Sequence, residues 1–248
     1  MSRIVVLLVW HMHQPEYRDP ATGAYLFPWT RLHALKDYAG MVKLLEEFPA
    51  VQVTFNLTPV LLRQVEHYAT GNFREHLFEL TFKPEAELTR EERLELLQHV
   101  FLGGERLILR LPRFRELYLR RRGAGAQPER LLPLLGHSDW LDLQVLSQLA
   151  WLDEFYLARD PLVRALVEKG RDYSEEDKQR LRAKEIELIG MVIPAYRAAA
   201  ARGQVELSTS PFYHPILPLL IDTEVARQAN PQGKLPATRF AYLEDARE

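Results

Sequence analysis

Two histidines, separated by one residue, follow the most apolar segment of the chain. His11 and His13 come directly after residues 4–10 (IVVLLVW), a run that is typical of a buried strand in a parallel sheet. Side chains alternate along a strand, so both imidazoles point the same way if the strand reaches residue 13. Two imidazoles at a strand end can bind a metal or hydrogen-bond to sugar hydroxyls. The alternative is that the two histidines only cap and pack a polar loop and have no role in binding or catalysis.

A second candidate lies in residues 203–209 (GQVELST), where polar and apolar side chains alternate. This period of two predicts a strand with one polar face. Glu206 stands at its centre, and a carboxylate in mid-strand is expensive to bury without a partner. Glu206 therefore marks either a face that lines a site or an edge strand whose polar face meets water.

Arginines are concentrated in residues 106–122, with Glu105 and Glu116 among them. A patch that binds phosphate or nucleic acid is conceivable. The interspersed acids and the net charge of -2 favour a solvated helix face instead.

The hydrophobic pattern predicts a chain in which strands and helices alternate at the start and helices dominate the middle. The expected elements are a strand (4–10), a helix (31–48), a strand (51–55), a helix (59–68), a helical region (75–200) that includes a long helix (174–201), and a strand (204–209). Such a β-α-β-α opening indicates a parallel sheet or barrel. Three strands are too few to close a barrel, and residues 238–248 have the pattern of a helix that is just beginning. We therefore expect the front part of a longer fold.

Composition excludes several classes of function. The 248 residues are 47% hydrophobic, enough for one large domain or a core with an insertion, so the chain is not disordered. Cysteine is absent, which excludes disulfides, thiolate metal sites and cysteine nucleophiles. No phosphate-binding loop, nucleophile elbow or zinc-protease motif occurs. Without a cleavable leader or a membrane-spanning segment, we expect a cytoplasmic protein that binds neither nucleic acid nor membrane.

Four segments together resemble glycoside hydrolase family 57, whose members act on α-glucans. They are residues 11–15 (HMHQP), 27–38 (FPWTRLHALKDY), 54–59 (TFNLTP) and 203–220, which contains GQVE and SPFYHP. The resemblance implies an α/β fold, an incomplete (β/α)7 barrel with a large helical insertion. Residues 1–248 would be the N-terminal part of the barrel domain, and residues 75–202 the helical insertion within it.

The same resemblance implies a retaining mechanism, in which a glutamate nucleophile and an aspartate acid/base stand about 5–5.5 Å apart. Neither matches a residue of this sequence, so no catalytic residue is assigned, and both are expected beyond the chain end. The implied substrate-binding residues are His11, His13, Gln14, Trp29, Glu206 and His214. The implied ligand is an α-glucan oligosaccharide or polysaccharide, with no cofactor and no metal. Hydrolysis, transfer and branching stay open, as does the oligomeric state.

Two further hypotheses compete with an enzyme of this family. One is a non-catalytic carbohydrate-binding or split subunit that a partner chain completes, because open sheet edges attract partners. The other is a metal-dependent sugar deacetylase or mannosidase that uses His11 and His13 as ligands. The absence of an Asp-Asp pair after the first strand counts against the second hypothesis.

Overall fold

The computed structural model describes residues 4–247 and contains one parallel sheet with the strand order β1-β2-β3. The strands are β1 (Val9–Met12), β2 (Val53–Leu57) and β3 (Val205–Ser208). Val9 lies opposite Thr54, and Thr54 lies opposite Glu206. The predicted parallel pairing of three strands is therefore confirmed, and all three carboxyl ends meet at one edge of the sheet.

The central strand β2 has one buried and one polar face. Val53, Phe55 and Leu57 are buried, and the Phe55 ring meets Tyr196 edge to face with 5.0 Å between centroids. Tyr196 belongs to helix α12 (Val192–Ala201), which covers this face of the sheet. The opposite face carries polar side chains, because strand residues point alternately to the two faces.

The prediction of a buried strand over residues 4–10 is wrong in its extent and its burial. The strand begins at Val9, and Met12 is its one buried residue. Residues 4–8 are exposed, with Leu7 at 82%. A run that is apolar on both faces needs cover on both faces. Within residues 4–247, β1 pairs with β2 alone, and its outer edge meets no strand.

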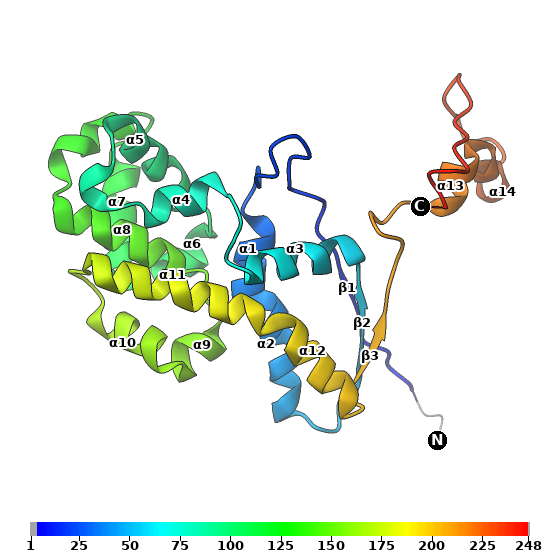
Figure 1. Ribbon diagram of the computed structural model, residues 1–248, viewed down its shortest axis with the longest axis horizontal. Helices are drawn as coiled ribbons and strands as arrows, with labels where there is room; N and C mark the ends of the chain where they lie inside the picture. Colours follow the sequence, from blue (N-terminus) through cyan, green and yellow to red (C-terminus); the bar gives the residue numbers. More distant parts are fainter. Residues whose placement is uncertain (1–3, 248) are drawn as a thin grey trace.

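Helices make up most of the remaining chain (Figure 1). Beside the sheet lie α1 (Trp29–His33), a π-helical turn (Ala34–Tyr38), α2 (Ala39–Leu44) and α3 (Pro59–Ala69). A helical bundle follows, consisting of α4 (His76–Phe82), α5 (Arg90–His99), α6 (Gly104–Leu109), α7 (Pro112–Gly123), α8 (His137–Leu149), α9 (Glu154–Arg159), α10 (Pro161–Lys169) and α11 (Glu175–Gly190). In Figure 1 this bundle stands on one side and the sheet on the other, with α11 and α12 running between them. None of the helices within residues 4–247 has the length and apolarity needed to cross a membrane.

The long helix predicted over residues 174–201 forms as two helices that meet at Met191. Its predicted cap is present, since the Ser174 hydroxyl accepts a hydrogen bond from the Asp177 amide at 3.2 Å. Pro194 explains the division, because proline has no N–H to donate to the carbonyl four residues earlier. Near the end of the chain, α13 (Leu217–Ile221) and α14 (Ala226–Ala229) are short, and residues 238–247 do not form the predicted helix. Residue 248 lies outside the described part.

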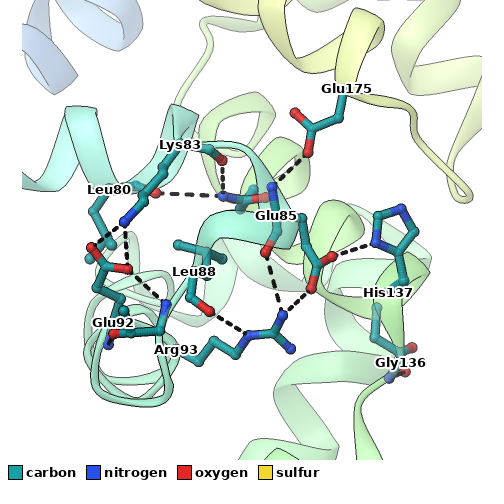
Figure 2. Close-up of polar contacts among 12 residues, drawn as sticks. Leu80, Lys83, Glu85, Leu88, Glu92, Arg93, Gly136, His137 and Glu175 are labelled. Carbon is teal, nitrogen blue, oxygen red and sulfur yellow. Dashed lines mark hydrogen bonds and ion pairs between the residues drawn. The ribbon is translucent and has the colours of Figure 1, made fainter.

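Buried charges hold the bundle together, as Figure 2 shows around Glu85. The Glu85 carboxylate is 3% exposed and binds Arg93 at 2.5 Å and the ring of His137. Its amide donates to the Glu175 carboxylate at 2.7 Å. The segment around Glu85 is thereby connected to α5, α8 and α11. The buried charge of Glu85 is tolerated because it is paired.

The arginine-rich helix α7 is only partly the solvated face that was predicted. Arg113 is 8% exposed, and its Nε lies 2.8 Å from Asp142 Oδ2 on α8. Asp139 and Glu116 also contact this guanidinium. The prediction is wrong for Arg113 because two of its acidic partners, Asp139 and Asp142, lie on α8 and are distant in sequence.

Candidate functional site

His11 stands in a row of polar side chains that crosses the sheet. Asn56 lies opposite it on β2, and Ser208 lies opposite Asn56 on β3. The Asn56 amide nitrogen donates to Ser208 Oγ at 3.1 Å, so Asn56 Oδ1 faces His11 Nδ1, at 2.8 Å. An amide oxygen only accepts, so His11 carries its proton on Nδ1 and presents Nε2 as an acceptor.

His13 is oriented in the same way by Thr58. The Thr58 hydroxyl donates to the Met12 carbonyl at 3.2 Å, which leaves its oxygen to accept from His13 Nδ1 at 3.3 Å. The imidazoles of His11 and His13 stack with 5.9 Å between ring centroids. The prediction that both point the same way is confirmed.

His214 joins the two strand-end histidines from a loop that follows β3. Its ring centroid lies 4.5 Å from that of His11 and 5.0 Å from that of His13. Its φ of 60° is in the left-handed region, which is rare for a residue other than glycine and costs on the order of 1–3 kcal/mol. The surrounding loop must therefore hold this backbone in place.

Arg63 on α3 anchors that loop. Its guanidinium carbon lies 4.6 Å from the centre of the Phe212 ring, and Nη2 donates to the Tyr213 hydroxyl at 3.2 Å. Glu16 pairs with the same guanidinium from the loop after β1. One cation thus connects the loops that carry His13 and His214.

The three imidazoles, His11, His13 and His214, form what we call the histidine cluster. Burial lowers the pKa of His13 from its ordinary value of 6.5, and the nearby His214 and His11 lower it further. His13 is therefore neutral at pH 7 and can share hydrogen bonds with hydroxyl groups. Within residues 4–247, no group of three or more His, Asp or Glu side chains has an arrangement that could hold a metal ion.

Glu206 lies on the polar face of the sheet, one row away from His11. It is exposed, and its Oε2 accepts a hydrogen bond from Thr54 Oγ1 at 3.1 Å. Residues two apart on a strand are separated by about 6.5–7 Å. The carboxylate therefore shares the face of the histidine cluster, and it is the one acidic residue in the three strands.

Gln14 lies behind the histidine cluster and holds the loop. Its amide nitrogen donates to the Tyr38 hydroxyl at 3.0 Å, and its oxygen accepts from the Tyr17 hydroxyl at 2.9 Å. Both ends of the amide are thus occupied by tyrosines. Its role in substrate binding stays a prediction.

Trp29 is the predicted residue that the structure places apart from the others. It begins α1 and is half-buried, and its ring meets Trp151 edge to face at 6.4 Å. With Phe27 and His76 it lines a hollow of about 310 Å³. Its contribution to a sugar site also stays a prediction.

Asn56, Thr58 and Ser208 were not singled out from the sequence, although they orient the histidines. The sequence pattern that could have indicated Asn56 and Thr58 is in residues 53–58 (VTFNLT), where apolar and polar side chains alternate as they do in β3. Two neighbouring strands with this alternation present one continuous polar face.

The family model for glycosyl hydrolase family 57 matches residues 7–242. The chain belongs to this family. The match includes both the histidine cluster and the helical bundle, and the predominantly helical α/β fold with a small parallel sheet is compatible with the family. Members of glycosyl hydrolase family 57 are glycoside hydrolases and transferases. No curated protein and no solved structure matches this chain.

Proposed function

We propose that this chain forms the sugar-binding part of a retaining hydrolase or transferase that acts on α-glucans. The histidine cluster at the carboxyl ends of three parallel strands is the observation that carries the proposal. Ligands of parallel α/β folds bind at this end of the sheet. Imidazoles with a fixed Nδ1 proton and a free Nε2 suit the hydroxyl groups of a neutral sugar.

The proposed chemistry needs a nucleophile and an acid/base at the sugar ring. A retaining enzyme requires two carboxyl groups about 5–5.5 Å apart. The three strands carry Glu206 alone. We therefore assign the nucleophile glutamate and the acid/base aspartate to chain outside residues 1–248 and treat these residues as the front of an incomplete (β/α)7 barrel. Glu206 would then support the substrate.

Histidine substitution tests the proposal. We expect His11→Ala to weaken binding of maltotriose about tenfold, which corresponds to roughly 1.4 kcal/mol, because a fixed acceptor is lost. Isothermal titration calorimetry on the purified chain measures the effect. His137→Ala, which removes an exposed histidine from the helical bundle, is the matched control. A wild-type chain that binds no maltooligosaccharide, or equal binding by the two variants, would overturn the proposal.

Catalysis by residues 1–248 is a separate expectation. We expect this chain to release no glucose or shorter oligosaccharide from maltoheptaose, because a retaining reaction cannot proceed without both carboxyl groups. Turnover that survives removal of contaminating amylase would contradict the assignment of the catalytic pair to other residues.

The open sheet favours a second candidate, a non-catalytic or split subunit that a partner chain completes. Residues 4–10 are exposed, and among the described strands β1 and β3 each pair on one side only. Unpaired edges of this kind bind further strands. Native mass spectrometry of the protein from its own cells separates the two candidates. A complex of a 28.9 kDa chain with a second polypeptide supports the split subunit, and one longer polypeptide supports the enzyme.

A further inference from the structure

A pocket of about 520 Å³ opens between the π-helical turn, helix α6 and the segment that joins α8 to α9. Pockets that bind small molecules commonly have volumes of roughly 300–1,000 Å³. The side chains that give this pocket its chemistry are His33, Asp37, Arg106, Trp151 and Asp153. None of them belongs to the histidine cluster.

The pocket is connected to the histidine cluster by a continuous series of contacts. Gln14, which follows His13, donates to the Tyr38 hydroxyl at 3.0 Å. The Tyr38 ring stacks on His33 with 6.3 Å between centroids, and His33 meets Trp151 edge to face at 6.0 Å. Three successive side-chain contacts thus link the loop after β1 to the pocket.

His33 is oriented for binding as the clustered histidines are. Its Nδ1 lies 2.6 Å from Asp37 Oδ2, and Lys36 Nζ lies 2.5 Å from the other oxygen of the same carboxylate. The carboxylate holds the Nδ1 proton of His33 and leaves Nε2 available. These three residues lie on α1 and the π-helical turn, a type of irregularity that is frequent at functional sites.

Asp153 also presents an available oxygen. Its Oδ1 accepts from the Phe155 amide at 2.7 Å, whereas Oδ2 has no hydrogen-bond partner within residues 4–247. Burial raises the pKa of this carboxyl group, and the neighbouring Asp37 and Glu154 raise it further. Gly40 makes room for the group, because a Cβ at position 40 would lie 2.0 Å from Oδ2.

The charges around the pocket are balanced. Lys36 pairs with Asp37, and Arg110 pairs with Glu154 at 2.5 Å. Arg106 is exposed, and within the described chain it forms no ion pair, so it and Asp153 offer one donor group and one acceptor group of opposite charge. A balanced pocket of this kind favours a neutral ligand with many hydroxyl groups over an ion.

We propose that this pocket is a second sugar-binding subsite, which takes a glucose unit of the same α-glucan chain that the histidine cluster binds. The Trp151 indole, which is 8% exposed, forms part of the apolar wall of the pocket, while His33, Arg106 and Asp153 bind hydroxyl groups. This inference rests on the proposed function and adds to it a preference for long glucan chains.

The indole N–H signals of the four tryptophans report directly on the pocket. The probe is the ¹⁵N-labelled chain of 248 residues, titrated with maltose and with maltoheptaose, and Trp151→Phe assigns the signal. We expect maltoheptaose to shift the Trp151 signal at a concentration at least five times lower than maltose requires. Trp140, which is fully buried, serves as an internal reference.

A double variant, Arg106→Ala/Asp153→Asn, tests the polar groups and retains an oxygen that can accept from the Phe155 amide. We expect it to abolish the Trp151 shift while maltose still binds at the histidine cluster with its affinity changed less than twofold. The matched control is Arg115→Ala/Asp160→Asn, which also changes an exposed arginine and a helix cap. It should bind both sugars as the wild type does.

The outcomes separate this inference from the proposed function. Suppose that maltose binding depends on His11 but that maltoheptaose does not shift the Trp151 signal. The subsite is then refuted, and the proposed function stands. The subsite is also refuted if maltose and maltoheptaose shift the Trp151 signal at the same concentration. It is refuted as well if the two double variants change the Trp151 shift equally. If neither sugar binds, both proposals fail.

Discussion

At the scale of single residues, each histidine of the cluster has a distinct support. Asn56 fixes His11, Thr58 fixes His13, and a left-handed turn places His214 against both. The rings are close enough that a proton on one disfavours a proton on the next. His13, the member of the cluster whose pKa burial and its two neighbours lower, is therefore a neutral hydrogen-bonding group near pH 7.

The pKa of His13 tests this crowding. Its pKa lies below 6.5 because of burial first, and then because of the charges that His214 and His11 would carry. We expect His214→Gln to raise the pKa of His13 toward 6.5, since it removes a neighbour that becomes cationic. A pH titration of the His13 ring protons by NMR measures the shift, with His76 as the reference. A pKa of His13 that stays constant or falls in the variant would contradict the electrostatic coupling.

At the scale of elements, Arg31 connects α1 to the helical bundle. Its guanidinium is fully buried and contacts Glu75 at 2.8 Å, Glu185 at 3.0 Å and the Gln148 oxygen at 2.9 Å. These partners lie before α4, on α11 and on α8. The network fixes the α1 segment that carries Trp29 and leads to the pocket beside His33.

Removal of the Arg31 guanidinium should destabilise the folded chain. We expect Arg31→Met to lower the free energy of unfolding by about 3–5 kcal/mol, because two buried carboxylates lose their shared partner. Arg90→Met, which changes an exposed arginine of α5, should lower it by less than about 0.5 kcal/mol. Urea denaturation of both variants measures the difference. Comparable losses in the two would show that the network contributes little.

The same network makes stability depend on pH. Burial raises the pKa of Glu185 to about 7, with a further contribution from Glu75, and Arg31 offsets only part of this. An acid with a raised pKa stabilises the folded state at low pH and loses that contribution as the pH rises from about 4.5 through 7. We therefore expect wild-type stability to fall between pH 5 and 7.5 by about 1–3 kcal/mol more than that of Glu185→Gln. Urea denaturation at the two pH values measures this, and Glu187→Gln, at an exposed position of α11, should behave as the wild type does. Parallel pH profiles for Glu185→Gln and the wild type would refute the raised pKa.

Local patterns in the sequence predicted some elements correctly and others incorrectly. The helix at 59–68, the strand within 204–209 and the Ser174 cap depend on neighbours within a few residues, and all three are confirmed. The Arg31 network joins residues 44 and 154 positions apart, so no local pattern could indicate it. The burial of residues 4–8 was mispredicted because burial depends on what covers a segment. For the site, the motif predicted His11, His13 and His214, whereas the supporting Asn56 and Thr58 required the register of the strands.

At the scale of the whole molecule, the sheet is the least covered part. Figure 1 shows the three strands beside the helical bundle, with the segment of α13 and α14 projecting away from it. Val5 and Leu7 are more than 80% exposed, and they precede the edge strand β1. Exposed apolar surface next to an open edge favours association.

Association of the purified chain should depend on this surface. We expect the wild type to form dimers or larger species at concentrations of tens of micromolar, and Val5→Lys/Leu7→Lys to remain monomeric because the charges oppose edge pairing. Size-exclusion chromatography with light scattering measures the mass. Leu134→Lys, at an exposed apolar position between α7 and α8, should associate as the wild type does. A monomeric wild type would show that the edge is already protected.

The central claim is that the histidine cluster binds a sugar ring at the carboxyl ends of the three strands. A crystal structure of the chain with maltotriose tests it most directly. The account predicts a glucose ring whose hydroxyls lie within hydrogen-bond distance of Nε2 of His11 and His13, with His214 beside it. Maltotriose bound elsewhere, with the three imidazoles making no contact to it, would contradict the account.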